Sequence, residues 1–287
     1  MVYYSGNLTG FGSGDAGGKK IKLLTAITSA SLTTNLKLCL DAGDENSYTS
    51  GQKWLDVSGG GYDFFLGTSA SAATDDPTFV GTAGGMSDEE YFLFDGGDRF
   101  EYDTSAETWM QSMHKNGANW TALFIDYHST TSGTSQLWSM ASYNGGTNIS
   151  GMAWLTNNTT SNTSSKHSLH TNADNSAPSD NAVNGTDDAV VHGQWNFRAV
   201  SLVDNGTSFF YLNGAYDQVG GSDTFTGANI TGSTGLYHSF GLGRAGGPSD
   251  YLKDGSRMAC VAIWTGGALS KANLDTIYTD VAERWGI

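Results

Sequence analysis

The chain has 287 residues, of which only 15% are charged, and its formal net charge is −15. So acidic a protein is an unfavourable partner for nucleic acid or an anionic membrane, because both attract basic surfaces. Glycine occurs 39 times and proline 3 times, a composition typical of short strands joined by tight turns rather than of a helical bundle. No apolar run approaches the ~18 residues of a membrane span, so we expect one large, soluble β-rich domain.

The N-terminal residues 1–33 are predicted to form a Gly-rich arm and docking segment. Residues 1–20 lack hydrophobic periodicity, which is typical of a segment that orders only on assembly. After them, "KKIKLLTAITSASLTTNLKLCLD" alternates apolar and polar residues in two bursts, which predicts strands. No basic leader with an apolar region follows the first methionine, so no secretory signal is expected.

The acidic stretch "LDAGDENSYTSGQKWLDVSG" (40–59) raises the question of a metal site. Its side chains with oxygen atoms suited to calcium include those of Asp41, Asp44, Asn46 and Asp56. An EF-hand loop starting at Asp41 would need glycine at the sixth position and glutamate at the twelfth, where Asn46 and Gln52 stand. The pattern favours scaffold, an Asp/Gly turn anchored by Tyr48 and Trp54. Calcium in another geometry is left open, and no metal ligand is assigned.

Strand-length runs bounded by Gly, Asn, Asp or Ser recur along the rest of the chain. They cover residues 91–96, 98–103, 120–128, 135–144, 150–156, 166–172, 194–204, 208–219, 238–244 and 257–266. The turns "DNGT" (204–207) and Asn213-Gly214 predict an antiparallel meander over residues 195–219. The polar segment 157–192 is predicted to form exposed loops around one short strand.

Two helices are predicted among these strands. In "TSAETWMQSMHKNG", Thr104 and Glu107 have the spacing of a capping box, just before Trp109. At the C-terminus, residues 270–286 place apolar side chains at helical spacing, with Ser270 as N-cap.

Cys39 and Cys260 lie near opposite ends of the sequence and could pair only if the first and last strands are neighbours. Without a secretory context we expect two free, buried thiols. Several asparagines stand in Asn-x-Ser/Thr triplets, including Asn119, Asn148, Asn157 and Asn229. In so polar a chain such triplets are expected by chance, so no glycosylation is predicted.

The strongest enzymatic pattern is "EYDTSAE", because retaining glycosidases use two carboxyl groups about 5–5.5 Å apart. Glu101 and Asp103 would share one face of a strand. Glu107 comes too late, since six extended residues cover roughly 20 Å. This pair supports a glycoside hydrolase only as a remote alternative.

The six histidines suggest no metal centre: His114, His128, His167, His170, His192 and His238. His167 and His170 are three residues apart in a predicted strand, where they would point to opposite faces, so zinc is disfavoured. We therefore assign no catalytic residue and no cofactor.

Several motifs together resemble a known family: "LCLDAGDENSY" (38–48), "FDG" (94–96), "FYLNGAY" (210–216) and "IWTGGALSKANLDTIY" (263–278). Over residues 34–287 the chain is similar to the laminin-G/concanavalin A-like jelly roll, in the form found in bacteriophage structural proteins. The resemblance implies an all-β, two-sheet antiparallel jelly-roll sandwich with a short internal helix and a C-terminal helix. Such motifs are packing and turn signatures, and they specify a fold better than a function.

The resemblance implies a non-enzymatic virion structural protein, a capsid decoration or a tail-associated part, displayed on the particle surface. The arm 1–33 would dock to other virion proteins, the site of assembly would be the host cytoplasm, and a homo-oligomer would suit a symmetric particle. The alternative is a lectin-like, carbohydrate-binding module that adheres to host-surface glycans.

Overall fold

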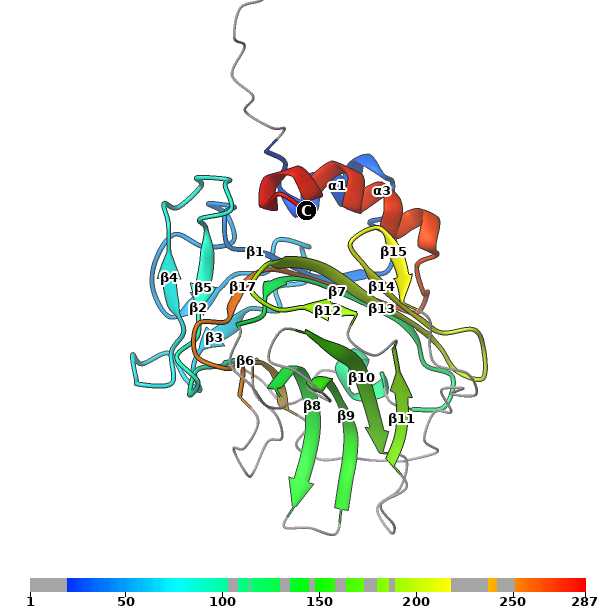
Figure 1. Cartoon of the computed structure of the whole chain (residues 1–287). Coiled ribbons are helices and arrows are strands. Elements are labelled where there is room, and N and C mark those ends of the chain that lie inside the picture. Colours follow the sequence, from blue (N-terminus) through cyan, green and yellow to red (C-terminus); the bar gives the residue numbers. More distant parts are fainter. Residues whose placement is uncertain are drawn as a thin grey trace, which may run out of the picture.

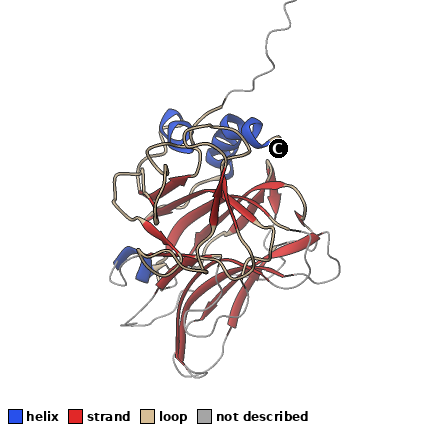
Figure 2. Cartoon of the chain, turned by 90° about the vertical axis from the view of Figure 1, so that its left-hand side faces the viewer, coloured by secondary structure: helices blue, strands red, loops and turns tan. Residues whose placement is uncertain are grey.

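Two antiparallel β-sheets and a layer of helices make up the fold (Figures 1 and 2). The computed structural model describes residues 20–102, 108–113, 115–129, 135–144, 148–157, 164–172, 180–185, 189–217, 237–241 and 251–287.

Sheet I has eight strands in the order β15-β14-β13-β7-β17-β5-β4, and β1 also pairs with β17. Its strands are β1 (Leu36–Asp41), β4 (Thr78–Val80), β5 (Tyr91–Leu93), β7 (Asn119–Tyr127), β13 (Trp195–Val203), β14 (Phe209–Leu212), β15 (Ala215–Asp217) and β17 (Arg257–Thr265). The central pair β7 and β17 is antiparallel, with Val261 opposite Phe124.

Sheet II has nine strands in the order β11-β10-β9-β8-β16-β6-β3-β2, and β12 also pairs with β10. Its strands are β2 (Lys53–Trp54), β3 (Phe64–Leu66), β6 (Phe100–Tyr102), β8 (Ser135–Asn144), β9 (Asn148–Asn157), β10 (Ser164–Asn172), β11 (Asp180–Asn184), β12 (Val190–Val191) and β16 (Tyr237–Phe240). Instead of the one short strand predicted in the segment 157–192, the described part holds β10, β11 and β12.

The main core lies between the two sheets. Alternation along β7 sends Trp120, Ala122 and Phe124 into this core, while Leu123 and Ile125 face the helices. Facing aromatic side chains from sheet II complete it: Trp54, Phe64, Phe100, Trp138, Trp154 and Phe240. The packing confirms an all-β, two-sheet sandwich with helices.

Helices α1 (Leu23–Ser29), α3 (Lys271–Val281) and the 3-10 turn η1 (Ala282–Trp285) cover the other face of sheet I (Figure 1). Of the two strands predicted after residue 20, the first is wrong, whereas the second is present as β1. Residues 23–29 are a helix, because Leu23, Ala26 and Ile27 fall on one helical face and are fully buried. Residues 20–32 therefore pack on the sandwich, whereas residues 1–19 of the predicted arm lie outside the described residues.

The C-terminal helix is confirmed with its cap. Ser270 accepts a hydrogen bond from the backbone of Asn273, whose side chain accepts one in return from the Ser270 backbone. The internal helix α2 (Thr108–Ser112) is also present and buries Met110. Its predicted capping pair, Thr104 and Glu107, lies outside the described residues.

The meander of β13, β14 and β15 is confirmed. Its turns use positive φ angles at Asn205 (53°), Asn213 (45°) and Gly214 (87°), which Asn and Gly adopt at low cost. Within the part of the chain that is described, no helix is long and apolar enough to cross a membrane.

Candidate functional site

The acidic stretch 40–59 is scaffold, because its carboxylates bind donors of the protein itself. Asp41 accepts hydrogen bonds from Arg284 Nη1 (2.9 and 3.0 Å) and from the backbone N–H of Leu23 (2.9 Å). Asp44 accepts from Lys22 Nζ (2.8 Å) and from the backbone of Asn46 (2.9 Å). These carboxylates hold the start of the fold to its end.

The other predicted features of this stretch also serve packing. Asp56 accepts hydrogen bonds from the backbone N–H groups of Cys39 (2.9 Å) and Ser58 (2.8 Å). Tyr48 donates its hydroxyl to the Gly51 carbonyl (3.1 Å), and Trp54 is fully buried, so both aromatics anchor the loop as predicted. No group of three or more metal-ligating side chains occurs among the described residues.

The two cysteines are free, buried thiols, as predicted. They lie on neighbouring strands, since Cys39 faces Ala262 and Asp41 faces Cys260 in the β1–β17 pair. Burial is the main cause that raises the pKa of both thiols, which makes them poor nucleophiles.

Glu101 lies on the outer face of sheet II, because its neighbours Phe100 and Tyr102 point into the core. Arg99 Nε donates to Glu101 Oε1 at 2.7 Å, and the same guanidinium pairs with Asp75 at 3.0 Å. Asp103 and Glu107 lie outside the described residues. Of the carboxylates on which the glycosidase alternative depends, the structure therefore describes only Glu101, and that carboxylate forms an ion pair with Arg99.

Three of the histidines belong to a buried polar cluster that the sequence did not reveal. Its centre is a fully buried ion pair, in which Arg198 Nε and Nη2 donate to Asp126 at 2.6 and 2.5 Å. His128, His167 and His192 are also buried. Asp126 and Arg198 are 72 positions apart, and the only signal in the sequence is a charge inside each of two apolar strands.

Each of these histidines has a defined place. The His167 ring stacks on Phe210 with centroids 5.0 Å apart, and its Nδ1 accepts a hydrogen bond from Trp154 Nε1 (3.2 Å). The rings of His128 and His192 lie 4.3 Å apart. Burial lowers the pKa of His128 and His167 well below the ordinary value. His114 lies outside the described residues, as do the side chains of His170 and His238.

A pocket of about 290 Å³ opens where the α2–β7 connection meets the end of β17. It is lined by Ser112, Met113, Asn116, Gly117, Ala118, Asn119, Trp120, Thr265 and Gly266. Buried Trp120, Met113 and Ala118 contribute apolar surface, whereas the exposed side chains of Asn116 and Asn119 are amides. We call this site the amide pocket.

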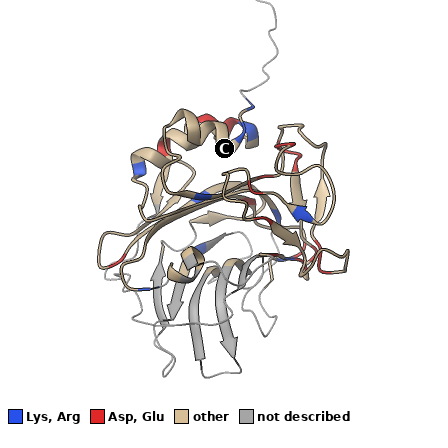
Figure 3. Ribbon diagram, turned by 180° about the vertical axis from the view of Figure 1, so that it is seen from behind, with Lys and Arg blue, Asp and Glu red and all other residues tan. Residues whose placement is uncertain are grey.

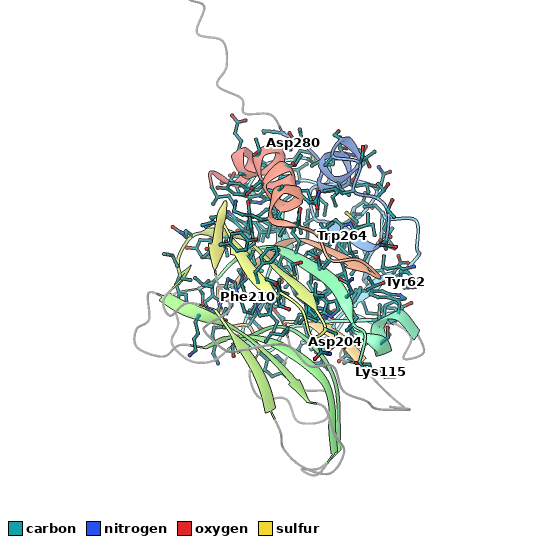
Figure 4. The ribbon with its side chains drawn as sticks, turned by 90° about the vertical axis from the view of Figure 1, so that its right-hand side faces the viewer. Tyr62, Lys115, Asp204, Phe210, Trp264 and Asp280 are labelled. Carbon is teal, nitrogen blue, oxygen red and sulfur yellow. The ribbon has the colours of Figure 1, made fainter. Side chains whose placement is uncertain are left out.

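Backbone hydrogen bonds fix the shape of the amide pocket. Trp120 Nε1 donates to the Met113 carbonyl (2.7 Å), and Gly266 N–H donates to the Asn119 carbonyl (2.8 Å). Asp204 accepts the Gly117 N–H (2.6 Å), and Figure 4 shows Asp204 near Lys115 at this end of the sandwich. These four backbone groups are thus engaged within the protein.

The side-chain amides of Asn116 and Asn119 form no hydrogen bond with another described residue. Each amide offers a donor and an acceptor, the pair of functions that recognises hydroxyl groups. Sequence reasoning missed this pocket, because "KNGANW" has only the appearance of a turn before a strand. Asn119 also begins one of the Asn-x-Ser/Thr triplets that we expect to occur by chance. The third residue of this triplet is Thr121, whose buried hydroxyl accepts a hydrogen bond from the Leu269 N–H (2.8 Å).

No protein-family model matches the sequence, and a comparison with curated proteins finds no match. Among solved structures, the chain is similar to Trypanosoma rangeli sialidase in complex with sialic acid, with a TM-score of 0.56 and 13% identity over 88% of this chain and 34% of that chain. It is also similar to the botulinum neurotoxin serotype D ligand-binding domain in complex with N-acetylneuraminic acid, with a TM-score of 0.55 and 15% identity over 90% of this chain and 55% of that chain.

The chain therefore spans about a third of the sialidase and about half of the neurotoxin domain. At these identities the likeness concerns the fold alone. The sheet-rich sandwich is an architecture that this chain shares with parts of those larger proteins.

Proposed function

We propose that the chain is a non-enzymatic, carbohydrate-binding β-sandwich of the concanavalin A-like jelly-roll type. The observation that carries the proposal is the amide pocket. It combines the apolar surface of Trp120 with the amides of Asn116 and Asn119, which have no partner among the described residues. Binding sites of this kind join an apolar wall to a few well-placed polar groups. Two structures with a similar fold hold sialic acid, which supports testing glycans first.

The size of the amide pocket favours a single sugar ring. Its volume of about 290 Å³ is at the lower limit of typical small-molecule sites, which begin near 300 Å³. The Thr265 hydroxyl is a third side chain at its wall that can bind a sugar hydroxyl. A chain-like polysaccharide would contact it through one terminal or branching residue.

The lining of the amide pocket argues for binding rather than hydrolysis. Glycosidases place two carboxyl groups on either side of the scissile bond. All nine lining residues are described, and none of them carries a carboxylate. Glu101 belongs to β6 of the other sheet and is paired with Arg99.

The test is a glycan array followed by titration calorimetry on the full chain, in the presence and absence of calcium. We expect the double variant Asn116→Ala and Asn119→Ala to bind the tightest-binding glycan at least about tenfold more weakly, because two hydrogen bonds of roughly 1 kcal/mol each are lost. Gln194→Ala removes an exposed amide elsewhere and should leave the affinity unchanged. If no glycan on the array binds, either with or without calcium, the proposal is rejected.

We also propose that this module is displayed on a virion, as the family resemblance implies. The described chain begins at exposed Lys20, just before α1, in the helix layer on the outer face of sheet I. A docking arm formed by residues 1–19 would therefore leave sheet II on the side away from the particle. Figure 3 shows charged residues of both signs on the helix layer, which is the region nearest such a contact.

The display role predicts a stoichiometric copy number in density-banded particles, measured by mass spectrometry against the major shell protein. Deletion of residues 1–19, which keeps α1 in place, should abolish attachment to the particle and leave glycan binding intact. A protein found only in the unassembled fraction would contradict display without affecting the glycan-binding proposal.

A further inference from the structure

One wall of the amide pocket is the turn 115–118, and hydrogen bonds fix this turn. The Ala118 N–H donates to the Lys115 carbonyl (3.0 Å), and the Asp204 N–H donates to the Ala118 carbonyl (2.8 Å). Between them Gly117 has a φ of 82°, and a Cβ added there would meet no described atom within 4 Å beyond its chain neighbours. The pocket therefore has a preformed wall with open space beside it, so a ligand need not order the turn in order to bind.

Three buried side chains give the amide pocket an apolar floor: Met113, Ala118 and Trp120. They are 2%, 8% and 1% exposed, respectively. An indole so deeply buried presents no open ring face on which a sugar can stack, and its N–H is engaged by the Met113 carbonyl. The apolar floor therefore suits a small apolar group, such as one methyl, rather than a whole sugar ring.

The polar part of the amide pocket consists mainly of two primary amides. The side chains of Asn116 and Asn119 are exposed and form no hydrogen bond with another described residue. Each carries N–H donors and a carbonyl acceptor. A second amide is the matching partner, because its carbonyl accepts where the asparagine donates and its N–H donates where the asparagine accepts. An acetamido group supplies this amide and a methyl directly attached to it.

The lining of the amide pocket is neutral. None of its nine described residues carries a charge. Beside the pocket, Lys115 and Asp204 contribute one charge of each sign (Figure 4), and His114 lies outside the described residues. The carboxylate of an acidic sugar would find no counter-charge in this lining, and the chain as a whole, with a net charge of −15, repels it.

We propose that the amide pocket binds a neutral N-acetylamino sugar. The acetamido methyl lies against the apolar floor, and the acetamido N–H and carbonyl pair with the side-chain amide of Asn116 or Asn119. This inference rests on the proposed glycan binding and adds the class of sugar. The volume of about 290 Å³ holds one such residue, and the Thr265 hydroxyl serves a ring hydroxyl.

The experiment titrates the unaltered full chain with monosaccharides and follows the indole N–H resonance of Trp120 by NMR. N-acetylglucosamine and N-acetylgalactosamine are compared with glucose and galactose, which lack the acetamido group. We expect saturable shifts with at least one acetamido sugar and at least about tenfold weaker binding of its parent hexose, because the parent lacks both the methyl and the amide.

Two further sugars separate the parts of the recognition. Fucose has a methyl group but no amide, and N-acetylneuraminic acid has the acetamido group together with a carboxylate. Each should bind at least severalfold more weakly than the better neutral acetamido sugar, the first for want of the amide pair and the second because its charge is uncompensated.

Variants test the two surfaces of the amide pocket. The double variant Asn116→Asp and Asn119→Asp keeps the size of both side chains but removes their N–H donors, and it should bind the acetamido sugar severalfold more weakly. Ala118→Val fills the apolar floor and should reduce the preference for the acetamido sugar over its parent hexose. Gln194→Ala, which removes an exposed amide elsewhere, should change neither. If Ala118→Val does not fold, the series of sugars on the unaltered protein decides.

The outcomes distinguish this inference from glycan binding in general. Equal affinities for an acetamido sugar and its parent hexose would overturn the inference and leave glycan binding intact. Tighter binding of fucose or of N-acetylneuraminic acid than of both neutral acetamido sugars would also overturn it. The absence of a saturable shift at Trp120 with every sugar would overturn it as well, and would extend to glycan binding as a whole only if no glycan on the array binds.

Discussion

Arg284 and Asp41 form a buried ion pair that joins the C-terminal 3-10 turn to the first strand. Arg284 Nη1 lies 2.9 and 3.0 Å from the two carboxylate oxygens, and the side chains are 0% and 1% exposed. Arg284 Nε also donates to the Ser87 carbonyl (3.1 Å), and Asp41 accepts the Leu23 N–H. One pair of side chains therefore holds η1, β1 and α1 together.

Arg284→Met is expected to lower the free energy of unfolding by about 3–5 kcal/mol, because it leaves the buried Asp41 carboxylate without its counter-charge. Urea unfolding measures the loss. Adding Asp41→Asn to this variant should recover part of it. As a control, Lys271→Met removes the exposed pair with Asp275 and should cost less than about 1 kcal/mol. A similar small effect for Arg284→Met would contradict the role of the pair.

The buried histidines predict a loss of stability in mild acid. Burial holds the pKa of His128 and His167 well below the ordinary value. Below pH ~6.5 the unfolded chain therefore binds more protons than the folded one, and the unfolding free energy falls by up to about 1.4 kcal/mol per pH unit for each histidine. Unfolding of His167→Gln at pH 7 and pH 5 should show a smaller loss than wild type. An equal loss of unfolding free energy between pH 7 and pH 5 in both proteins would contradict a contribution from His167.

The carboxyl group of Asp98 predicts a pH dependence of stability whose sign is opposite to that of the buried histidines. Burial, with help from the nearby charges of Asp95 and Asp76, raises the pKa of Asp98 to about 7. The folded chain therefore keeps a proton that the unfolded chain releases near pH 4, and stability is lost as the pH rises from 4 through 7.

Asp98→Asn keeps an acceptor for the Asp95 N–H, which donates to this side chain at 2.8 Å. We expect the variant to be roughly 2 kcal/mol more stable than wild type at pH 8, with an advantage that shrinks toward pH 4. Thermal unfolding of both proteins across this range checks it. A constant difference at every pH would show that Asp98 does not titrate with the raised pKa.

Helix α1 belongs to the folded unit, and a matched pair of variants tests this. Ile27 is fully buried and Thr25 is exposed on the same helix. Ile27→Ala should lower the unfolding free energy by about 2–5 kcal/mol, whereas Thr25→Ala should change it by less than about 0.5 kcal/mol. Equal, small changes in unfolding free energy for the two variants would indicate that α1 belongs to the N-terminal arm and not to the folded unit.

Local signals in the sequence predicted their elements correctly. Ser270 caps α3 because its partner Asn273 is three residues away, and Asn213-Gly214 forms its turn through its own backbone preference. Such features depend on neighbours in the chain, so one sequence suffices to find them. The scaffold role of the stretch 40–59 was predicted in the same way, from the density of turn residues.

Features that depend on distant partners were missed. The positions of Leu23, Ala26 and Ile27 carry a helical pattern, but a helix of seven residues is stabilised mainly by the layer it packs on. The Asp126–Arg198 pair needs the register between β7 and β13, which no single sequence displays. Asn116 and Asn119 meet Thr265 in the amide pocket only because β7 pairs with β17.

The pairing of β1 with β17 has a consequence for how the protein is made. Among the described strands, β1 hydrogen-bonds only to β17, with Asp41 opposite Cys260. During synthesis β1 therefore emerges early and has no partner until residues 257–265 follow. Contacts between such distant segments form slowly, and an unpaired strand is prone to associate with other chains. We therefore expect chaperones and proteases to act mainly on incomplete chains in which β17 has not yet been synthesised.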